Sequence, residues 1–294
     1  MKKGILSILL FVPFLLQAQQ KIATNTPKSP YQFTTTNFDD GWISTPKEDW
    51  VEVTKGTMRV LLHYGNPDRS SMDYKTINKN AWNQFIAPRY SNMKDQFMLS
   101  NNISYEAGYF SSATLTDNAS GQTVFVVLFQ KGRGPWTEFI VPDKATFVQH
   151  FGIDKVDIYF SGWDPLTKMS GYNRFAVAPS DLTGKWSSNY SGYLQYVNTY
   201  TGLSAGANAH SSVQYYNFKA GNTYDWEIKV ASGMVGNQQF KSAKSSGKLS
   251  MPDNWQLACS NMEGKPKTYP VYFSCTKAGR ILWIDGTAYV KNDQ

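Results

Sequence analysis

The sequence contains little cysteine and little histidine. Among its 294 residues there are two cysteines and three histidines. So few cysteines exclude a disulfide-rich scaffold, and none of these residues stands at the spacing of a zinc or other metal motif. We therefore expect neither a metal ion nor another cofactor.

Charged side chains are also scarce. They make up 17% of the residues, and the formal net charge is only +7. No basic cluster stands out along the chain, and a concentrated basic surface is what binding to a phosphate backbone requires. The sequence therefore argues against a nucleic-acid partner.

Long apolar runs are missing except at the beginning, where residues 5–16 are almost entirely apolar. Lys2 and Lys3 precede this run and residues 17–19 follow it, the order of charged, apolar and small residues typical of a secretory signal. A membrane-spanning helix needs about 20 apolar residues. We predict a signal peptide at residues 1–19, a polar leader at 20–30, and an exported chain, periplasmic or secreted, without a transmembrane segment.

Aromatic residues, in contrast, are abundant at 15%, with 18 tyrosines. This composition favours pleated, half-buried surfaces over long exposed helices. The rings either pack sheets together or line a groove for an apolar or sugar ligand. The length suits two domains, and the change of pattern near Ala178 and Pro179 places the boundary between residues 31–178 and 179–294.

The first domain is predicted to be α+β, an antiparallel sheet with flanking helices. Apolar residues three to four apart follow Asp73, which can cap a helix that ends before Pro88. The apolar run 124–129 is too continuous to have a solvated face and predicts a central strand. Other predicted elements are a hairpin at 50–64, strands at 103–115 and 136–141, a short helix at 143–152 and a helical piece at 154–160.

The segment with Gly41 and Trp42, followed by paired strands, resembles the PsbP-like domains. Membership would imply an antiparallel sheet flanked by helices and a role in photosystem assembly or as a binding adaptor. No functional residue of that family is assigned to this chain.

The second domain is predicted to be all-β. About eight short strands recur at intervals of 8–12 residues, as expected of a small up-and-down barrel. A loose loop rich in Gly, Ala and Ser is expected up to Ser212. The strands are predicted at 193–200, 215–218, 224–230, 248–251, 255–259, 271–275, 281–284 and 289–290.

This region resembles the bacterial lipocalin-like domains of the calycin type. The resemblance rests on Gly184-Lys185-Trp186 as a G-x-W motif and on the phrases at 216–218 and 221–224, with Arg280 near the end. It implies an eight-stranded barrel in which Gly184, Trp186 and Arg280 are structural, the arginine packing over the tryptophan.

A barrel of this size holds its own side chains and at most one small ligand. Tyr196, Tyr216, Phe218 and Trp226 are the candidate ligand contacts, and the ligand would be a small hydrophobic or aromatic molecule. The alternative is a barrel filled by its own side chains.

Cys259 and Cys275 flank a short connection between two predicted strands. Pairing of these strands could bring the thiols together, and in an oxidising compartment a disulfide would stabilise the fold by about 3 kcal/mol. Two separate thiols are the alternative.

One catalytic pattern occurs, the G-x-S-x-G sequence around Ser204. It marks a nucleophile only at a sharp turn from strand to helix, and a small-residue loop is expected here. The acidic residues Glu48, Asp49, Glu106 and Glu138 could include an acid–base pair, but sequence gives no distance between them. We therefore expect no enzyme and no catalytic residue.

Three functions remain for comparison with the structure. The first is an exported binding protein with a ligand inside the barrel. The second is a surface module that binds a glycan or a protein partner through exposed aromatic rings. The third is a serine hydrolase that uses Ser204.

Overall fold

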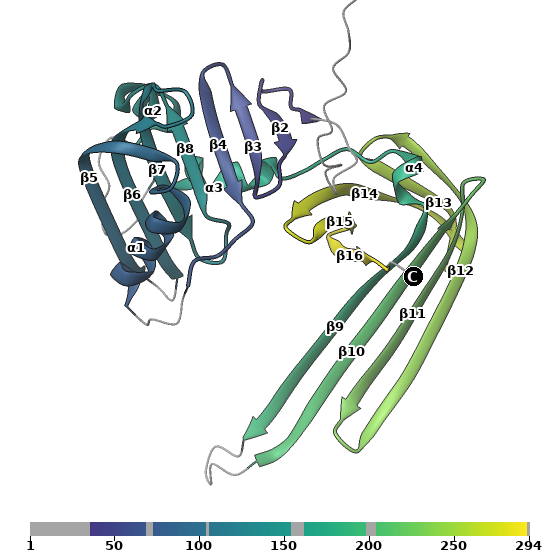
Figure 1. Ribbon diagram of the computed structural model, residues 1–294. Helices are drawn as coiled ribbons and strands as arrows, with labels where there is room; N and C mark the ends of the chain where they lie inside the picture. The colour runs from purple at the N-terminus through teal and green to yellow at the C-terminus, as the bar shows by residue number, and fades with distance from the viewer. Residues whose placement is uncertain (1–35, 69–72, 104–105, 154–161, 198–203, 293–294) are drawn as a thin grey trace, which may run out of the picture.

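A computed structural model describes residues 36–68, 73–103, 106–153, 162–197 and 204–292. An eight-stranded antiparallel sheet with helices is followed by a closed eight-stranded barrel (Figure 1), which confirms the predicted fold class. The predicted signal peptide, the leader and the helical piece at 154–160 lie outside the described residues. None of the described helices is long and apolar enough to cross a membrane.

The sheet of the first domain has the strand order β1-β2-β3-β4-β8-β7-β6-β5. The hairpin predicted at residues 50–64 is the pair β3 and β4. The strands are β1 (Thr36–Asn37), β2 (Ile43–Pro46), β3 (Trp50–Lys55), β4 (Met58–His63), β5 (Tyr90–Ile103), β6 (Glu106–Asp117), β7 (Thr123–Lys131) and β8 (Thr137–Val141).

Strand β7 lies between two apolar layers, which explains its continuous apolar sequence. Val126 and Leu128 face the layer beneath helix α1 (Tyr74–Phe85), whereas Val127 and Phe129 face the opposite layer. The second layer is covered by the helices α2 (Lys144–Phe151) and α3 (Asp164–Lys168), followed by the 3-10 turn η1 (Met169–Tyr172). Both faces of the sheet are therefore buried, as the prediction of a central strand requires.

Helix α1 begins where the sequence predicts. The carboxylate of Asp73 accepts hydrogen bonds from the backbone N–H groups of Lys75 (3.3 Å) and Thr76 (3.0 Å). Such a cap satisfies N–H groups that have no partner within the helix. The side chains of Ile77, Ala81 and their neighbours at helical spacing are buried against the sheet.

The second domain is an up-and-down barrel in the order β10-β11-β12-β13-β14-β15-β16-β9. It follows the short helix α4 (Pro179–Leu182). Pairing of Val290 and Lys291 with Ser187 and Trp186 closes it. Its strands are β9 (Gly184–Val197), β10 (Ser204–Lys219), β11 (Thr223–Met234), β12 (Asn237–Asp253), β13 (Gln256–Met262), β14 (Lys265–Thr276), β15 (Gly279–Ile284) and β16 (Thr287–Lys291).

One apolar cluster runs from the sheet into the barrel. It passes through Trp163 and Phe175 on the connecting segment. Phe175 pairs with Phe273 of β14 through two backbone hydrogen bonds of 2.8 and 2.9 Å. The side chain of Asn173 bonds both the N–H and the C=O of Cys275.

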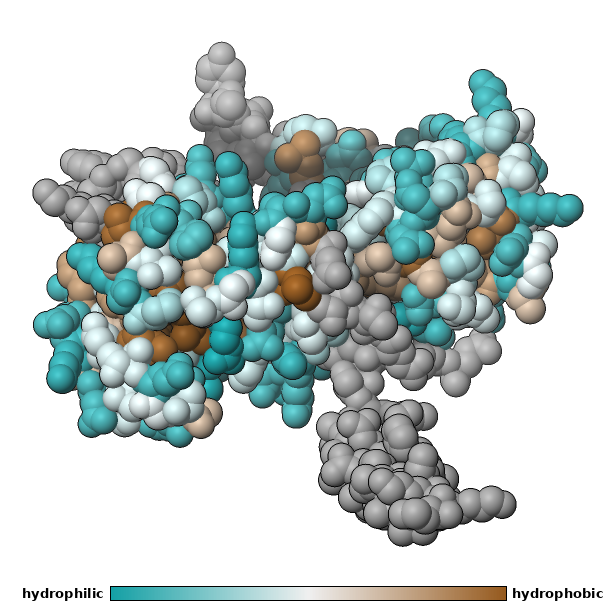
Figure 2. Space-filling model, turned by 90° about the horizontal axis from the view of Figure 1, so that it is seen from above, coloured by the Kyte–Doolittle hydropathy of each residue, from teal (hydrophilic) through white to brown (hydrophobic). Residues whose placement is uncertain are grey.

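Seen from above, the surface of the molecule carries small apolar patches surrounded by hydrophilic residues (Figure 2).

Four neighbouring barrel strands, β9 to β12, extend beyond the closed part of the barrel (Figure 1). They have 12–17 residues and β14 has 12, whereas β13, β15 and β16 have 5–7. At about 3.3 Å per residue, the long strands continue well past the point where the barrel is closed. They project from it as a four-stranded sheet (Figure 1), which we call the extension and define as residues 188–197, 204–214, 228–234 and 237–245.

The prediction of a loose loop up to Ser212 is wrong. Residues from Ser204 onward belong to β10, which pairs with β9 on one side and β11 on the other. Backbone hydrogen bonds to two neighbours hold this stretch extended although its Gly, Ala and Ser residues have little preference for strands. A tight turn at residues 220–222 joins β10 to β11, with Gly221 and Asn222 at positive φ.

The predicted disulfide is also wrong: Cys259 and Cys275 are both free and buried. Their strands do pair, but Cys259 lies opposite Lys267, and Cys275 is eight residues farther along β14. That offset corresponds to roughly 25 Å of extended strand, far beyond the Cα separation of about 7 Å that a disulfide can bridge.

Both thiols are therefore expected to be present and unreactive. Burial raises the pKa of Cys259 to about 11 and raises that of Cys275 further, so little thiolate exists near neutral pH. A thiol-specific reagent should label neither cysteine in the native protein and both after denaturation without reductant. Fewer than two labelled thiols in denaturant would contradict this result.

Candidate functional site

The barrel interior contains three of the four candidate ligand contacts. Tyr216, Phe218 and Trp226 point inward and are buried, together with Trp186. The rings of Tyr216 and Phe218 are stacked with centroids 5.2 Å apart, and Tyr289 meets Tyr216 edge-on at 5.3 Å. Burial strongly raises the pKa of Tyr216. These side chains pack against one another, as in the alternative of a barrel filled by its own residues.

The G-x-W motif lies at the closure of the barrel. The indole Nε1 of Trp186 donates a 2.6 Å hydrogen bond to the carbonyl of Leu182. The cation above this ring is Lys291, with Nζ 5.7 Å from the ring centroid. Gly184 has a φ of +119°, and a Cβ there would come within 3.0 Å of the Lys291 side chain, so both backbone and space require glycine.

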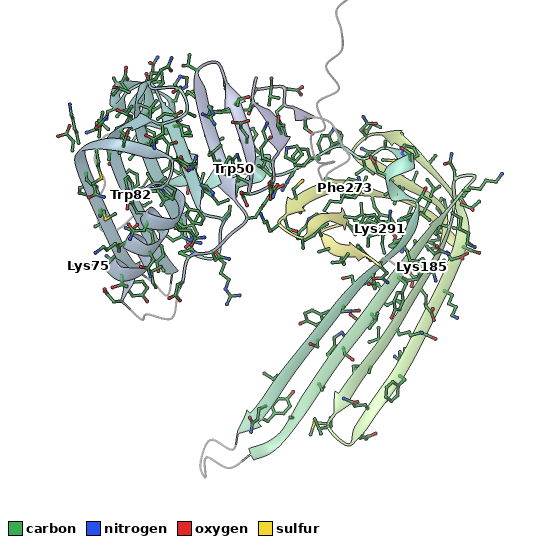
Figure 3. All side chains as sticks on the ribbon, viewed as in Figure 1. Trp50, Lys75, Trp82, Lys185, Phe273 and Lys291 are labelled. Carbon is green, nitrogen blue, oxygen red and sulfur yellow. The ribbon has the colours of Figure 1, made fainter. Side chains whose placement is uncertain are left out.

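Arg280, which the resemblance places over Trp186, lies one ring away. Its guanidinium is 4.5 Å from the Phe273 centroid, and Phe273 lies 5.7 Å from Trp186. The same guanidinium forms a 3.2 Å ion pair with Asp181. Figure 3 shows Phe273, Lys185 and Lys291 around this end of the barrel.

The fourth candidate, Tyr196, lies near the far end of the extension. Directly paired residues of antiparallel strands share one face of a sheet. The register therefore continues the inner surface of the barrel onto one face of the extension, which we call the inner face. Tyr190, Leu194 and Tyr196 lie on it, and Tyr190 is 61% exposed.

A hollow of about 660 Å³ lies on the inner face. Its walls carry one phenol ring, one leucine and several amide, hydroxyl and imidazole groups, and the rings of Tyr190 and His210 are 5.9 Å apart. None of the lining residues is Asp, Glu, Lys or Arg. They are Tyr190, Gly192, Leu194, Asn208, His210, Ser232, Gly233, Asn237 and Gln239.

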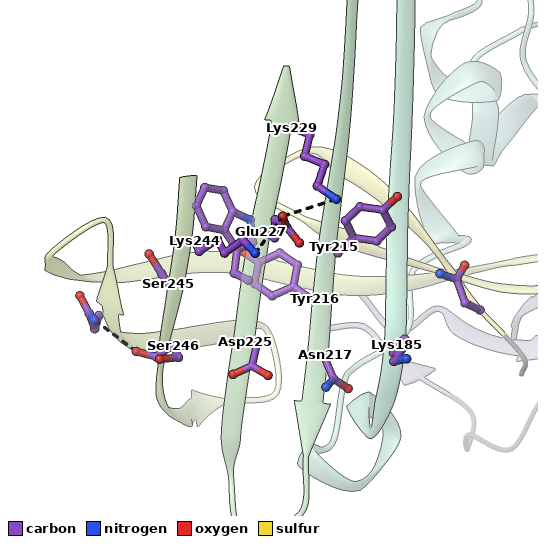
Figure 4. Close-up of a pocket in the computed structure, with 13 residues that line it drawn as sticks. Lys185, Tyr215, Tyr216, Asn217, Asp225, Glu227, Lys229, Lys244, Ser245 and Ser246 are labelled. Atoms are coloured by element: carbon purple, nitrogen blue, oxygen red, sulfur yellow. Dashed lines mark hydrogen bonds and ion pairs between the residues drawn. The ribbon is translucent and has the colours of Figure 1, made fainter. Parts of the chain in front are cut away.

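The opposite face of the sheet has a different character. A hollow of about 850 Å³ there is lined mainly by charged and polar residues of β9 to β12, and it also borders the candidate residues Tyr216 and Trp226 (Figure 4). Glu227 forms ion pairs with Lys229 at 3.5 Å and with Lys244 at 3.3 Å, and Lys229 also lies over the ring of Tyr215. Glu227, Lys229 and Lys244 are thus partnered with one another, so these three charges offer little to a ligand.

A buried carboxylate is the centre of a third cluster, in the first domain. Glu138 is fully buried and accepts hydrogen bonds from the Tyr90 hydroxyl at 2.6 Å and from Nε2 of His63 at 2.9 Å. Arg89 donates to the same carboxylate and to the carbonyl of Phe85. An ionised carboxylate only accepts hydrogen bonds, so Nε2 of His63 carries the hydrogen.

Opposing effects act on the pKa of the Glu138 carboxyl. Burial would raise its pKa, but the hydrogen bond from His63 and the charge of Arg89, together with the Tyr90 hydroxyl, outweigh it and hold the pKa below its usual value. Burial beside this carboxylate strongly raises the pKa of Tyr90. Arg89 is also held between the rings of Trp50 and Tyr90, each 5.2 Å away.

This cluster borders a hollow of about 370 Å³ that reaches the second domain. Lys277 closes it from the barrel and pairs with Asp49 and, at 3.8 Å, with Glu48. The structure thus brings together His63 and Glu138, which are 75 positions apart in the sequence. Every charged group of the cluster has a protein partner, which is what a structural network requires.

The remaining sequence candidates are dispersed. Ser204 begins β10 and is followed by a strand, not by the helix that a nucleophile elbow needs. The side chains of Ser204 and Glu106 lie outside the described part of the structure. His150 lies in the last turn of α2, where a cationic side chain favours the helix dipole. Among the described residues no group of three His, Cys, Asp or Glu side chains could hold a metal ion.

Comparison with known proteins adds no assignment. A scan against protein-family models finds none that matches the chain, and searches of curated proteins and of solved structures find no match either. Any functional interpretation therefore rests on this chain's own residues.

Proposed function

We propose that the protein is an exported, non-enzymatic binding protein that engages a glycan chain on the inner face of the extension. The observation that carries this proposal is an uncharged hollow next to exposed Tyr190 and Leu194. Sugars present both hydroxyl groups and apolar C–H faces. An exposed phenol ring can pack against such a face, while nearby amides and hydroxyls exchange hydrogen bonds with the sugar hydroxyls.

Residues of three further strands supply those polar groups. Asn208 and His210 come from β10, Ser232 from β11 and Gln239 from β12. β10 and β11 have a paired strand on both sides, and β12 forms a long hairpin with β11. The distances between these side chains are therefore set by the regular geometry of the sheet. The hollow is open along the extension, which suits a chain-like ligand better than a compact molecule.

A small apolar ligand inside the barrel is the other candidate of the same class. It would have to displace the packed side chains of Tyr216, Phe218 and Trp226, and close-packed interiors resist such rearrangement. The exposed rings of the extension need no rearrangement to meet a partner. This contrast supports the surface site over an interior one.

Binding to an array of purified polysaccharides tests the proposal. We expect at least one uncharged glycan to bind, and Tyr190→Ala to weaken that binding about tenfold, the equivalent of about 1.4 kcal/mol. Affinities would be measured by titration calorimetry with the glycan that the array identifies.

Tyr215→Ala is the matched control, because Tyr215 lies on the opposite face of the same strands and is 37% exposed. It should leave the affinity unchanged. The proposal fails if no glycan binds, or if the two alanine variants weaken binding equally.

A further inference from the structure

Strand β9 has an unpaired edge along the extension. Its second neighbour, β16, pairs only with Trp186 and Ser187. From Ser188 to Val197 no described strand lies on that side, and Figure 1 shows this part of β9 at the margin of the sheet. The backbone N–H and C=O groups along such an edge can pair with another strand.

This edge lacks the features that normally prevent pairing. Residues 189–197 contain no proline and no charged side chain. The other margin of the extension, on β12, carries Lys241 and Lys244, both exposed. Lysines on an edge strand oppose association, and their absence permits it. The two margins are therefore unequal, and only that of β9 is suited to receive a strand.

We propose that β9 pairs antiparallel with β9 of a second copy of this chain, around a two-fold axis at position 193. This register places Tyr190 opposite the partner subunit's Tyr196 and Gly192 opposite the partner subunit's Leu194. Aromatic cross-strand pairs are favourable. Leu194 is 59% exposed in one copy. The Tyr190 ring lies over Gly192 of its own chain, so Leu194 would pack against the ring of the partner subunit's Tyr190.

The second copy fits this edge better than other occupants do. Pairing of β9 with β12 of another copy would repeat without closing and produce filaments. It would also meet Lys241 and Lys244. The symmetric arrangement closes as a dimer, uses the same neutral edge twice, and joins two inner faces into one continuous surface. It does not depend on what that surface binds.

Sedimentation velocity of the purified protein over a range of concentrations tests the dimer. The wild type should convert from monomer to dimer as the concentration rises. The double variant Tyr190→Lys with Leu194→Lys should remain monomeric, because it places like charges along both edges. Phe240→Lys is the control: Phe240 is 79% exposed on β12, away from the β9 edge, and this variant should dimerise like the wild type.

A cross-link tests the register without depending on the lysine variant. Tyr190→Cys combined with Tyr196→Cys should form a covalent dimer on mild oxidation, whereas Tyr190→Cys alone should not. The native cysteines are buried and should not compete. A wild type that stays monomeric overturns the inference, as does a dimer that the lysine variant leaves intact or a cysteine pair that does not cross-link.

The outcomes also separate this inference from the proposed function. A monomer that still binds a glycan through Tyr190 would refute the dimer alone. A dimer that binds no glycan would refute the proposed function alone.

Discussion

Replacing Glu138 with alanine is expected to lower the free energy of unfolding by roughly 3–5 kcal/mol. The side chain is fully buried and accepts hydrogen bonds from His63, Arg89 and Tyr90. Its removal leaves the buried donors of His63 and Tyr90 without their acceptor and the partly exposed Arg89 without its carboxylate, and each buried donor left unsatisfied costs about 1–3 kcal/mol. A small protein has only about 5–15 kcal/mol in total.

Glu227→Ala is the matched control. Glu227 also lies on a strand and also meets two cations, Lys229 and Lys244, but both lysines are largely exposed. Ion pairs in contact with water contribute about 0–1 kcal/mol. Urea denaturation followed by circular dichroism gives both free energies. Equal losses in the two variants would show that the buried network does not stabilise the first domain.

The effect of Glu138 should also depend on pH. The pKa of this carboxyl is lower in the folded protein than its usual value of 4.5. A lowered pKa stabilises the folded state fully above the unfolded value, and this stabilisation is lost as the pH falls through the folded value. The difference in stability between the wild type and Glu138→Ala should therefore be constant near neutral pH and narrow below about pH 4. A difference that widens in acid would contradict this sign.

Several elements could be predicted because a local signal decides them. Asp73 followed by apolar residues at helical spacing determines the start of α1. The apolar run of β7 indicates burial on both faces. The number of barrel strands follows from turn residues at regular intervals, such as Gly221 and Asn222. In each case neighbouring residues alone carry the information.

The features that could not be predicted depend on pairing between distant segments. The first half of β10 resembles a loop in its small residues, and only its neighbours on both sides make it a strand. Glu138 and its partners are separated by 48 to 75 positions in the sequence. The cysteines could be placed on paired strands, but the strand register that separates them could not be inferred. The exposed face with Tyr190 and Leu194 was missed for the same reason.

The same distinction applies to the candidate ligand residues. Aromatic residues at alternating positions indicate a shared face, and Tyr216, Phe218 and Trp226 do share the barrel interior. Tyr196 follows the same alternation but lies beyond the closure of the barrel, where that face is open to solvent. Alternation thus identifies the face, while strand length decides whether the face is core or surface.

Trp186→Ala is expected to destabilise the barrel by roughly 3–5 kcal/mol. The ring is completely buried, packs against Phe273, and bonds the carbonyl of Leu182. Alanine would leave a large cavity and remove the donor to that carbonyl. Trp186 also sits at the pairing of β9 with Lys291 of β16, so the loss falls where the barrel is closed.

Two further variants separate the contributions of the ring. Trp186→Phe keeps an aromatic ring but loses the hydrogen bond, and should cost less than Trp186→Ala by about 1–2 kcal/mol. Trp255→Ala removes a tryptophan that is 38% exposed at the turn between β12 and β13, and should cost less than about 1 kcal/mol. If Trp186→Ala were no more destabilising than Trp255→Ala, closure of the barrel would not depend on this ring. The structural role of the G-x-W motif would then have to be rejected, because packing at this position is the physical basis for it.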